Sequence, residues 1–226
     1  MPVVSLLPRM FGKGKAWRSE HNLPLHTSKL GRIVELCRGK DVLDVGCVGG
    51  DMGIEVDRTS HAQFEAVARS CVGIDIVADE IARWKAKGHN VIFADAEDFA
   101  VDRKFDIIVA ADLIEHLANP GRFLERARSH LKPSGRLCIV TPNAHSLNNV
   151  FKSLLGLRVA SNPEHTCWYD RTTLHQLLAR YGFRPVEEYW QDYEAHPVAA
   201  LVLRFRKNLA AHMIMVAGLE SGRGSA

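Results

Sequence analysis

The stretch DVLDVGCVGGD, residues 41–51, decides the fold, because a short apolar segment runs directly into a loop with three glycines. Its apolar residues predict a buried strand that ends at Gly46. Glycine at that point lets the backbone approach a ligand closely and adopt dihedral angles that other residues avoid. A nucleotide-bearing cofactor, a phosphate or an ordinary strand-to-helix turn would each account for such a loop.

Strands and helices alternate along the chain around this loop. Strands are expected at 41–46, 71–76, 90–95, 105–112 and 136–143, and two more near the end at 183–190 and 212–218. Helices are expected at 27–39, 52–70, 78–88, 119–135 and 171–182, the last with Thr172 or Thr173 near its start. Strands that are apolar on both faces and alternate with helices predict an α/β fold, with a parallel sheet covered by helices on both sides.

The composition excludes several classes of protein. The net charge is only +3, with basic residues scattered along the chain, so nucleic acid is not an expected partner. The five cysteines form no CxxC pair, which argues against a zinc site or a disulfide framework and favours a reducing cytoplasm; no metal is predicted. The most apolar stretch, near 198–218, is interrupted by Arg204, Arg206 and Lys207, so we interpret it as buried structure and expect no membrane partner.

Two acidic residues end the strands that follow the loop. Asp75 ends the second strand, where a carboxylate can accept hydrogen bonds from both ribose hydroxyls or cap the next helix. Asp95 ends the third strand and could accept a bond from an adenine amino group or cap a turn. A nicotinamide fingerprint would need glycine where the chain has Val48 and Asp51, and no lysine follows the loop as in a Walker A motif. The pattern favours an adenosine cofactor of another kind.

Five segments in order resemble the successive motifs of class I S-adenosylmethionine-dependent methyltransferases. They are DVLDVGCVGGD, GIDIVADEI, FADAEDF, FDIIVAADLIEHL and LKPSGRLCIVTPN. A looser similarity, through HTCWYDRTTLHQLLARYGF, is to the branch of small-molecule methyltransferases that resembles the ubiquinone-biosynthesis enzymes. The resemblance implies a Rossmann-like sheet of seven strands, order 3-2-1-4-5-7-6 with the last strand antiparallel. It also implies S-adenosyl-L-methionine as cofactor and S-adenosyl-L-homocysteine as product.

The resemblance also assigns roles to residues at the ends of the strands. Asp44 would orient the loop and the cofactor's amino group, and the loop itself would hold the methionine end. The remaining cofactor residues that it implies are Gly46, Cys47, Val48, Asp75, Ile76, Asp95, Ala96, Ala111 and Asp112.

Two features depart from the family pattern. The middle glycine of the usual GxGxG loop is Val48, whose side chain could narrow the loop. The stretch from Gly53 to Cys71 is longer than usual, which suggests an extended helix or an extra turn. Its segment HAQF, residues 61–64, could reach the cofactor or a partner chain.

Methyl transfer to a hydroxyl requires an acceptor in line with the methyl group and a base for the hydroxyl proton. Histidine is the natural base near neutral pH. The candidates are His116 in DLIEHL, which could instead only pack and hydrogen-bond at the start of a helix, His165 in NPEHTCWYD, which could instead only order its loop, and His145 in TPNAHS. The aromatic residues Trp168, Tyr169, Tyr189 and Trp190 could surround an acceptor or belong to the core.

Four segments make up the predicted domain organisation. Residues 1–26 form an N-terminal arm or lid, in which Trp17, Arg18, His21 and His26 could close over the cofactor. Residues 27–219 form the methyltransferase domain, about 144–170 being an insertion that caps the acceptor site, and residues 220–226 form a flexible tail.

The function predicted from the sequence is methyl transfer to a small molecule, most simply to oxygen of a natural-product, phenolic or sugar intermediate. The alternatives are an N-methyltransferase, an RNA or protein methyltransferase, and a cofactor-binding regulator without catalysis. The chain is expected to act in the cytoplasm as a monomer or homodimer.

Overall fold

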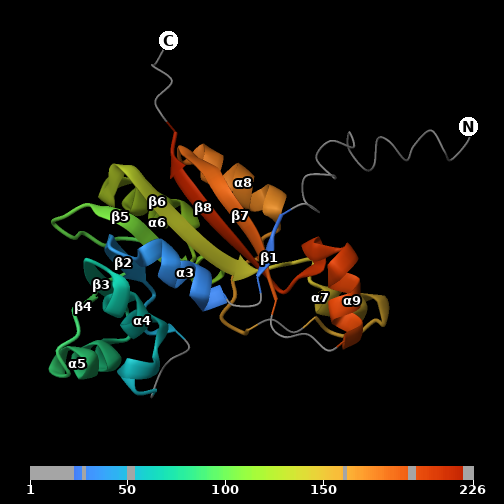
Figure 1. The fold of residues 1–226 in the computed structure, drawn as a ribbon, viewed down its shortest axis with the longest axis horizontal. Coiled ribbons are helices and arrows are strands. Elements are labelled where there is room, and N and C mark those ends of the chain that lie inside the picture. Colours follow the sequence, from blue (N-terminus) through green and yellow to red (C-terminus); the bar gives the residue numbers. More distant parts are fainter. Residues whose placement is uncertain (1–22, 27–28, 50–53, 160–161, 193–196, 221–226) are drawn as a thin grey trace, which may run out of the picture.

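The computed structural model describes residues 23–26, 29–49, 54–159, 162–192 and 197–220. This part of the chain folds around one eight-stranded sheet (Figure 1). The strands are β1 (Leu25–His26), β2 (Asp41–Val45), β3 (Ser70–Asp75), β4 (Val91–Phe93), β5 (Phe105–Ala111), β6 (Leu131–Pro142), β7 (Phe183–Gln191) and β8 (His212–Leu219). The helices are α3 (Lys29–Cys37), α4 (Ser60–Val67), α5 (Ala78–Ala86), α6 (Pro120–His130), α7 (Leu147–Leu154), α8 (Arg171–Arg180) and α9 (Pro197–Phe205). Short 3-10 helices are η3 (Val56–Arg58), η4 (Ile114–His116) and η5 (Lys207–Leu209).

The strand order is β1-β7-β8-β6-β5-β2-β3-β4. Only β8 runs antiparallel to its neighbours β6 and β7, whereas the other pairs are parallel. Counted from β2, this is the predicted order 3-2-1-4-5-7-6 with the last strand antiparallel, so the fold class is confirmed. The eighth strand, β1, comes from the predicted N-terminal arm and forms the edge of the sheet beside β7, with Leu25 opposite Trp190.

Alternation along each strand divides the core between the two faces of the sheet. Ile108 and Ala110 of β5 belong to a cluster that includes α6 and α8. Their neighbours Ile107 and Val109 belong to a second cluster with α3 and α4. Successive side chains of a strand point to opposite faces, so an apolar strand requires helices on both sides. Figure 1 shows α3 and α4 on the near face and α6 and α8 behind the sheet.

The ends of the helices follow from local sequence. Pro120 occupies the first turn of α6, where its missing N–H costs nothing. Thr172 and Thr173 lie near the start of α8, as predicted, and Asp170 is its N-cap; Asp170 accepts a hydrogen bond from the Thr173 amide, and Thr173 completes a capping box. Thr27 and Ser28, the first two residues of the helix predicted at 27–39, lie outside the described residues.

The helix predicted at 52–70 was too long. Among the described residues of that stretch, the chain forms only the 3-10 turn η3 and the two-turn helix α4. Thr59 separates them, because its backbone is extended and its side chain caps α4 by accepting from the Ala62 amide. Strand β3 then begins at Ser70. The added length of this region is therefore an extra turn.

The predicted insertion is closed at its base. The Ala144 amide donates to the Tyr169 carbonyl at 3.0 Å, so the two ends of the segment meet beside the end of β6. Helix α7 lies within it. Helix α9, in the stretch interpreted as buried, contributes Leu203 to the core but leaves Leu201 and Phe205 exposed. None of the helices in the described ranges has both the length and the hydropathy needed to span a membrane.

Candidate active site

The glycine loop follows β2 at the carboxyl edge of the sheet. Gly46 and Gly49 adopt positive φ angles of 76° and 45°, which a side chain would strain. Val48 is 1% exposed and packs with Val56 and Trp84 beneath the loop. Its side chain therefore anchors the loop from below, and the backbone on the ligand side stays uncovered by that side chain.

Asp75 ends β3 directly beside this loop. One carboxylate oxygen, Oδ2, accepts the amide of Val48 at 2.9 Å and that of Gly49 at 3.4 Å. The other, Oδ1, accepts the Val77 amide at 3.1 Å, within the turn that leads into α5. Asp75 thus holds the loop and orders the next turn at the same time, and a ribose would share these oxygens with the loop amides.

Asp44 lies on β2 two residues before Gly46 and is 4% exposed. Its Oδ2 is 2.9 Å from Nδ1 of His61, a fully buried residue of α4. The other ring nitrogen of His61 lies 3.4 Å from Glu65, whose second oxygen contacts His89. The sequence singled out the segment that contains His61 but not this residue; its signal was a histidine and a glutamate one helical turn apart.

The ends of β3 and β4 bring exposed apolar side chains to the same edge. Asp95 is exposed, and its Oδ1 accepts the Glu97 amide at 2.8 Å, while Ala96 is buried. Ile76 is 64% exposed although it directly follows Asp75, and Phe93 at the end of β4 is also exposed. Exposed apolar side chains beside a carboxylate suit a planar, amino-bearing ring. Phe93 was not predicted, because an aromatic residue in a strand is usually core.

The end of β5 is held in an uncommon backbone conformation. Asp112, which follows Ala111, has φ +50°, and it is the one residue other than glycine with positive φ in the described ranges. Such strain of about 1–3 kcal/mol persists where the surroundings enforce it, often at functional sites. Its carboxylate lies 3.9 Å from His212 at the start of β8. This turn therefore presents Asp112 at the same edge as the glycine loop.

Two of the three predicted histidines meet. The rings of His116 and His165 pack edge to face with centroids 4.6 Å apart. Thr166 ties their segments together, because its amide donates to the Glu115 carbonyl at 2.8 Å and its hydroxyl to the Leu117 carbonyl at 2.8 Å. Burial and the nearby His116 lower the pKa of His165.

Glu115 adds a carboxylate beside these rings. It is 2% exposed and accepts the Thr141 hydroxyl at 2.9 Å. Donor atoms of Glu115, His116 and His165 lie within 4.8 Å of one another. Two imidazoles and a carboxylate are a donor set that suits a divalent cation, so this cluster could hold a metal as well as a proton.

His145 lies apart from that pair, on a hollow of about 400 Å³ formed by the insertion. The residues that line it are Ala144, His145, Asn149, Val150, Ser153, Leu154, Val159 and Trp168. Trp168 also packs edge to face against His165, with ring centroids 6.0 Å apart. The hollow therefore adjoins the histidine pair through one indole.

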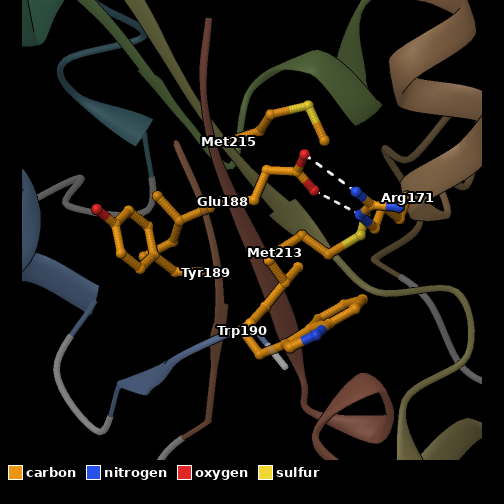
Figure 2. Close-up of a pocket in the computed structure, with 8 residues that line it drawn as sticks. Arg171, Glu188, Tyr189, Trp190, Met213 and Met215 are labelled. Carbon is orange, nitrogen blue, oxygen red and sulfur yellow. Dashed lines mark hydrogen bonds and ion pairs between the residues drawn. The ribbon is translucent and has the colours of Figure 1, made fainter. Parts of the chain in front are cut away.

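The other predicted aromatic residues belong to the core. Trp190 is 3% exposed and Tyr169 is 8% exposed. Figure 2 shows Trp190 beside Met213, above which Arg171 makes two hydrogen bonds to Glu188. The space between them is about 10 Å³, room for at most one water, and cannot take an acceptor. Trp17, Arg18 and His21 lie outside the described residues, and His26 packs edge to face on Tyr189.

Comparisons with known proteins agree on the family. Residues 20–188 match the family described as methyltransferase domain. A ubiquinone biosynthesis O-methyltransferase of Nitrobacter winogradskyi is 31% identical over 162 residues, which covers 66% of this chain and 57% of that protein. The chain thus spans little more than half the length of that relative.

Solved structures share the fold. An S-adenosylmethionine-dependent methyltransferase of Archaeoglobus fulgidus superposes with a TM-score of 0.59 at 20% identity, over 96% of this chain and 99% of that one. The 1,6-didemethyltoxoflavin N1-methyltransferase of Burkholderia thailandensis, solved with its substrate and S-adenosylhomocysteine, has a TM-score of 0.55 at 18% identity, over 96% and 89%. The match over residues 20–188 shows that the chain belongs to the methyltransferase domain family.

Proposed function

We propose that this methyltransferase transfers a methyl group to an oxygen atom of a small molecule held between the glycine loop and the insertion. The observation that supports the proposal most directly is the pair His116 and His165 beside the hollow of about 400 Å³. That volume lies in the range of small-molecule sites, and its walls are mainly apolar, as such sites are. A phenolic or comparable planar acceptor would fit between Leu154 and Trp168.

The cofactor is proposed to lie along the carboxyl edge of β2, β3 and β5. Asp44 would receive its amino group, Asp75 its ribose and Asp95 its adenine, with Ile76 against the ring. Gly46, Cys47 and Val48 would hold the methionine end, and Ala96, Ala111 and Asp112 would complete the lining. Backbone amides and carboxylates fixed in advance suit a ligand with a positive sulfonium and a polar tail.

His165 is the favoured proton acceptor. Burial and the nearby His116 lower its pKa, so the ring is neutral near pH 7 and can take the hydroxyl proton. Its Nδ1 is buried and has no hydrogen-bond partner among the described residues. The bound cofactor supplies the electrophilic methyl group, while the chain aligns the acceptor and receives the proton.

The test compares His165 and His145 on a panel of phenols, sugars and amines, with formation of S-adenosylhomocysteine as the readout. His165→Ala should lower kcat about 100-fold while the cofactor Kd stays within twofold, since a general base contributes about 10²–10⁴ in rate. His145→Ala is the matched control and should change KM for the acceptor more than kcat. Equal losses in both variants, or turnover with amines alone, would reject transfer to oxygen with a histidine base.

Treatment with a chelator distinguishes two roles of the cluster Glu115, His116 and His165, namely proton transfer and metal binding. If the histidines move a proton, activity should be unchanged after treatment with EDTA. Activity that vanishes with EDTA and returns with one divalent cation would instead assign Glu115, His116 and His165 as metal ligands. Turnover on RNA or protein that weakens steeply with salt would favour a polymer substrate. Cofactor binding without turnover on any substrate would favour a regulator.

A further inference from the structure

A fully buried histidine stands behind the proposed cofactor edge, on a helix that takes no part in it. We propose that His61 is a positioning residue that fixes the Asp44 carboxylate toward the cofactor's amino group by a hydrogen bond from Nδ1. The inference rests on the proposed location of the cofactor. It assigns a second function to α4, which otherwise only covers the sheet.

The contacts fix the ring on every side. Nδ1 lies 2.9 Å from Asp44 Oδ2, and Nε2 lies 3.4 Å from Glu65 Oε1. The ring stacks on Trp84, with centroids 5.8 Å apart and planes at 24°. Behind it is Gly73, where a Cβ would lie only 2.7 Å from His61 Cε1. The imidazole therefore has one orientation, and so does the carboxylate that it binds.

The same glycine connects the ring to the loop. A Cβ on Gly73 would also lie 2.8 Å from the Sγ of Cys47, the residue after Gly46. His61 and Cys47 thus share the space above Gly73, and a displaced ring would press on the loop. Asp44 and the loop are two residues apart on β2, so one side chain controls both parts of the proposed amino-acid pocket.

The electrostatics favour a hydrogen bond over simple packing. Burial lowers the pKa of His61, but hydrogen bonds to Asp44 and Glu65 outweigh it and raise that pKa to about 9. A charged ring donates from Nδ1 to Asp44, while its Nε2 forms an ion pair with Glu65 at 3.4 Å. Glu65 also contacts a second histidine, His89, whose Nδ1 is 2.5 Å from Glu65 Oε2. An apolar residue would fill the space equally well but would leave Asp44 buried without this donor.

Two amide substitutions test the direction of the bond. The Asn amide nitrogen occupies the place of Nδ1 and can still donate to Asp44, whereas the Gln amide nitrogen occupies that of Nε2 and reaches Glu65. Calorimetry with S-adenosylhomocysteine at pH 7 should give a Kd for His61→Asn within about threefold of wild type. His61→Gln and His61→Leu should weaken binding about 30-fold or more, the effect of one charge-assisted hydrogen bond.

Equal losses for Asn and Gln would mean that the ring acts by packing and would overturn the inference, as would wild-type affinity in all three variants. A second measurement serves if one variant fails to fold: Asp44→Asn with and without His61→Leu. If His61 acts through Asp44, the double variant should bind no worse than Asp44→Asn; additive losses would overturn the inference. Failure of the wild type to bind S-adenosylhomocysteine would reject the proposed cofactor site instead.

Discussion

The cofactor edge and the insertion, the two sides of the candidate site, are built in opposite ways. At the proposed cofactor edge Asp44 and Asp75 are less than a tenth exposed and accept hydrogen bonds, whereas Asp95 is exposed. In the insertion the apolar residues are exposed, with Leu154 80% and Phe151 59% exposed on α7. One side buries its polar groups inside the fold, and the other leaves its apolar groups outside.

The difference indicates what each side can tolerate. A buried carboxylate with several fixed partners is already oriented before a ligand arrives, and losing it damages both the fold and the site. An exposed leucine contributes little to folding, because its surface is still in contact with water. We therefore expect substitutions at the cofactor edge to change stability and binding together, and substitutions in the insertion to change acceptor binding alone.

The largest effect should come from Asp75. Replacing it with Ala removes the acceptor for the Val48, Gly49 and Val77 amides as well as the proposed ribose contact. We expect the Kd for S-adenosylhomocysteine to rise about a thousandfold, or ~4 kcal/mol, since hydrogen bonds to a charged group contribute about 1.5–3 kcal/mol each. Isothermal titration calorimetry measures it.

Asp95→Ala is the matched control at the same edge. That carboxylate is exposed and accepts the amide of Glu97 within its own turn. Its loss should weaken the cofactor less than tenfold and leave the melting temperature nearly unchanged. If the Kd of Asp75→Ala for S-adenosylhomocysteine were as low as that of Asp95→Ala, the buried carboxylate would not preorganise the cofactor edge.

The next effect is a pH dependence of stability that originates at His61. Its pKa rises from the ordinary 6.5 to about 9 in the folded state, so the folded chain binds the proton more tightly than the unfolded chain does. The stabilisation is complete below pH 6.5 and is lost as the pH rises through about 9. It should be on the order of 3 kcal/mol, at ~1.4 kcal/mol per pKa unit.

Urea unfolding of wild type and His61→Asn at pH 6 to 9.5 measures this contribution by difference. The comparison is needed because burial also raises the pKa of Cys37, Cys47 and Cys71, and each thiol favours the unfolded state above about pH 9. A stability difference between the two proteins that stays constant across this range would show that folding does not change the pKa of the ring.

The positions of Gly46, Asp75 and Asp95 at one edge of the sheet could be predicted from the sequence, because each strand carries its own signal. A buried run that ends in Gly46, Asp75 or Asp95 marks the carboxyl end of a strand, and parallel strands bring those ends together. The contact between Asp44 and His61 could not be predicted, since it joins residues 17 positions apart across two elements. It depends on the exact rotation of α4 over the sheet, which the segment HAQF alone does not fix.

The insertion was predicted as a unit but not in detail. Its segment lacks the alternating pattern of a strand, so position between β6 and α8 was the main guide. The contact of His116 with His165 depends on Thr166, whose hydrogen bonds to Glu115 and Leu117 cross about 50 residues of sequence. His145 was grouped with them because it follows β6, yet the chain turns it onto the hollow.

A smaller effect should follow from Gly73→Ala. The new methyl group would lie 2.7 Å from His61 and 2.8 Å from Cys47, so one of them has to move. Overpacking of this kind costs about 1–3 kcal/mol, and we expect ~2 kcal/mol with a parallel loss of cofactor affinity. Gly39→Ala is the control for destabilisation without this contact: nothing lies within 4 Å of its added Cβ, but its φ of +66° strains any side chain, so this variant should lose stability and keep its cofactor affinity. A Gly73 variant that lost stability but kept full affinity would separate the two properties at the cofactor edge.

The smallest effect on folding, and the sharpest contrast, should come from Leu154→Ser. Leu154 is 80% exposed and lines the hollow, so its replacement should change the free energy of unfolding by less than about 0.5 kcal/mol. If the acceptor packs there, its KM should rise about three- to tenfold, because a buried leucine contributes about 1.5–3 kcal/mol and this one is covered only in part. The cofactor Kd should not move. The control is Leu201→Ser on α9, because Leu201 is equally apolar and 59% exposed but lies outside the hollow. An equal rise in KM in that variant would mean that the exposed apolar residues act on the acceptor without forming its site.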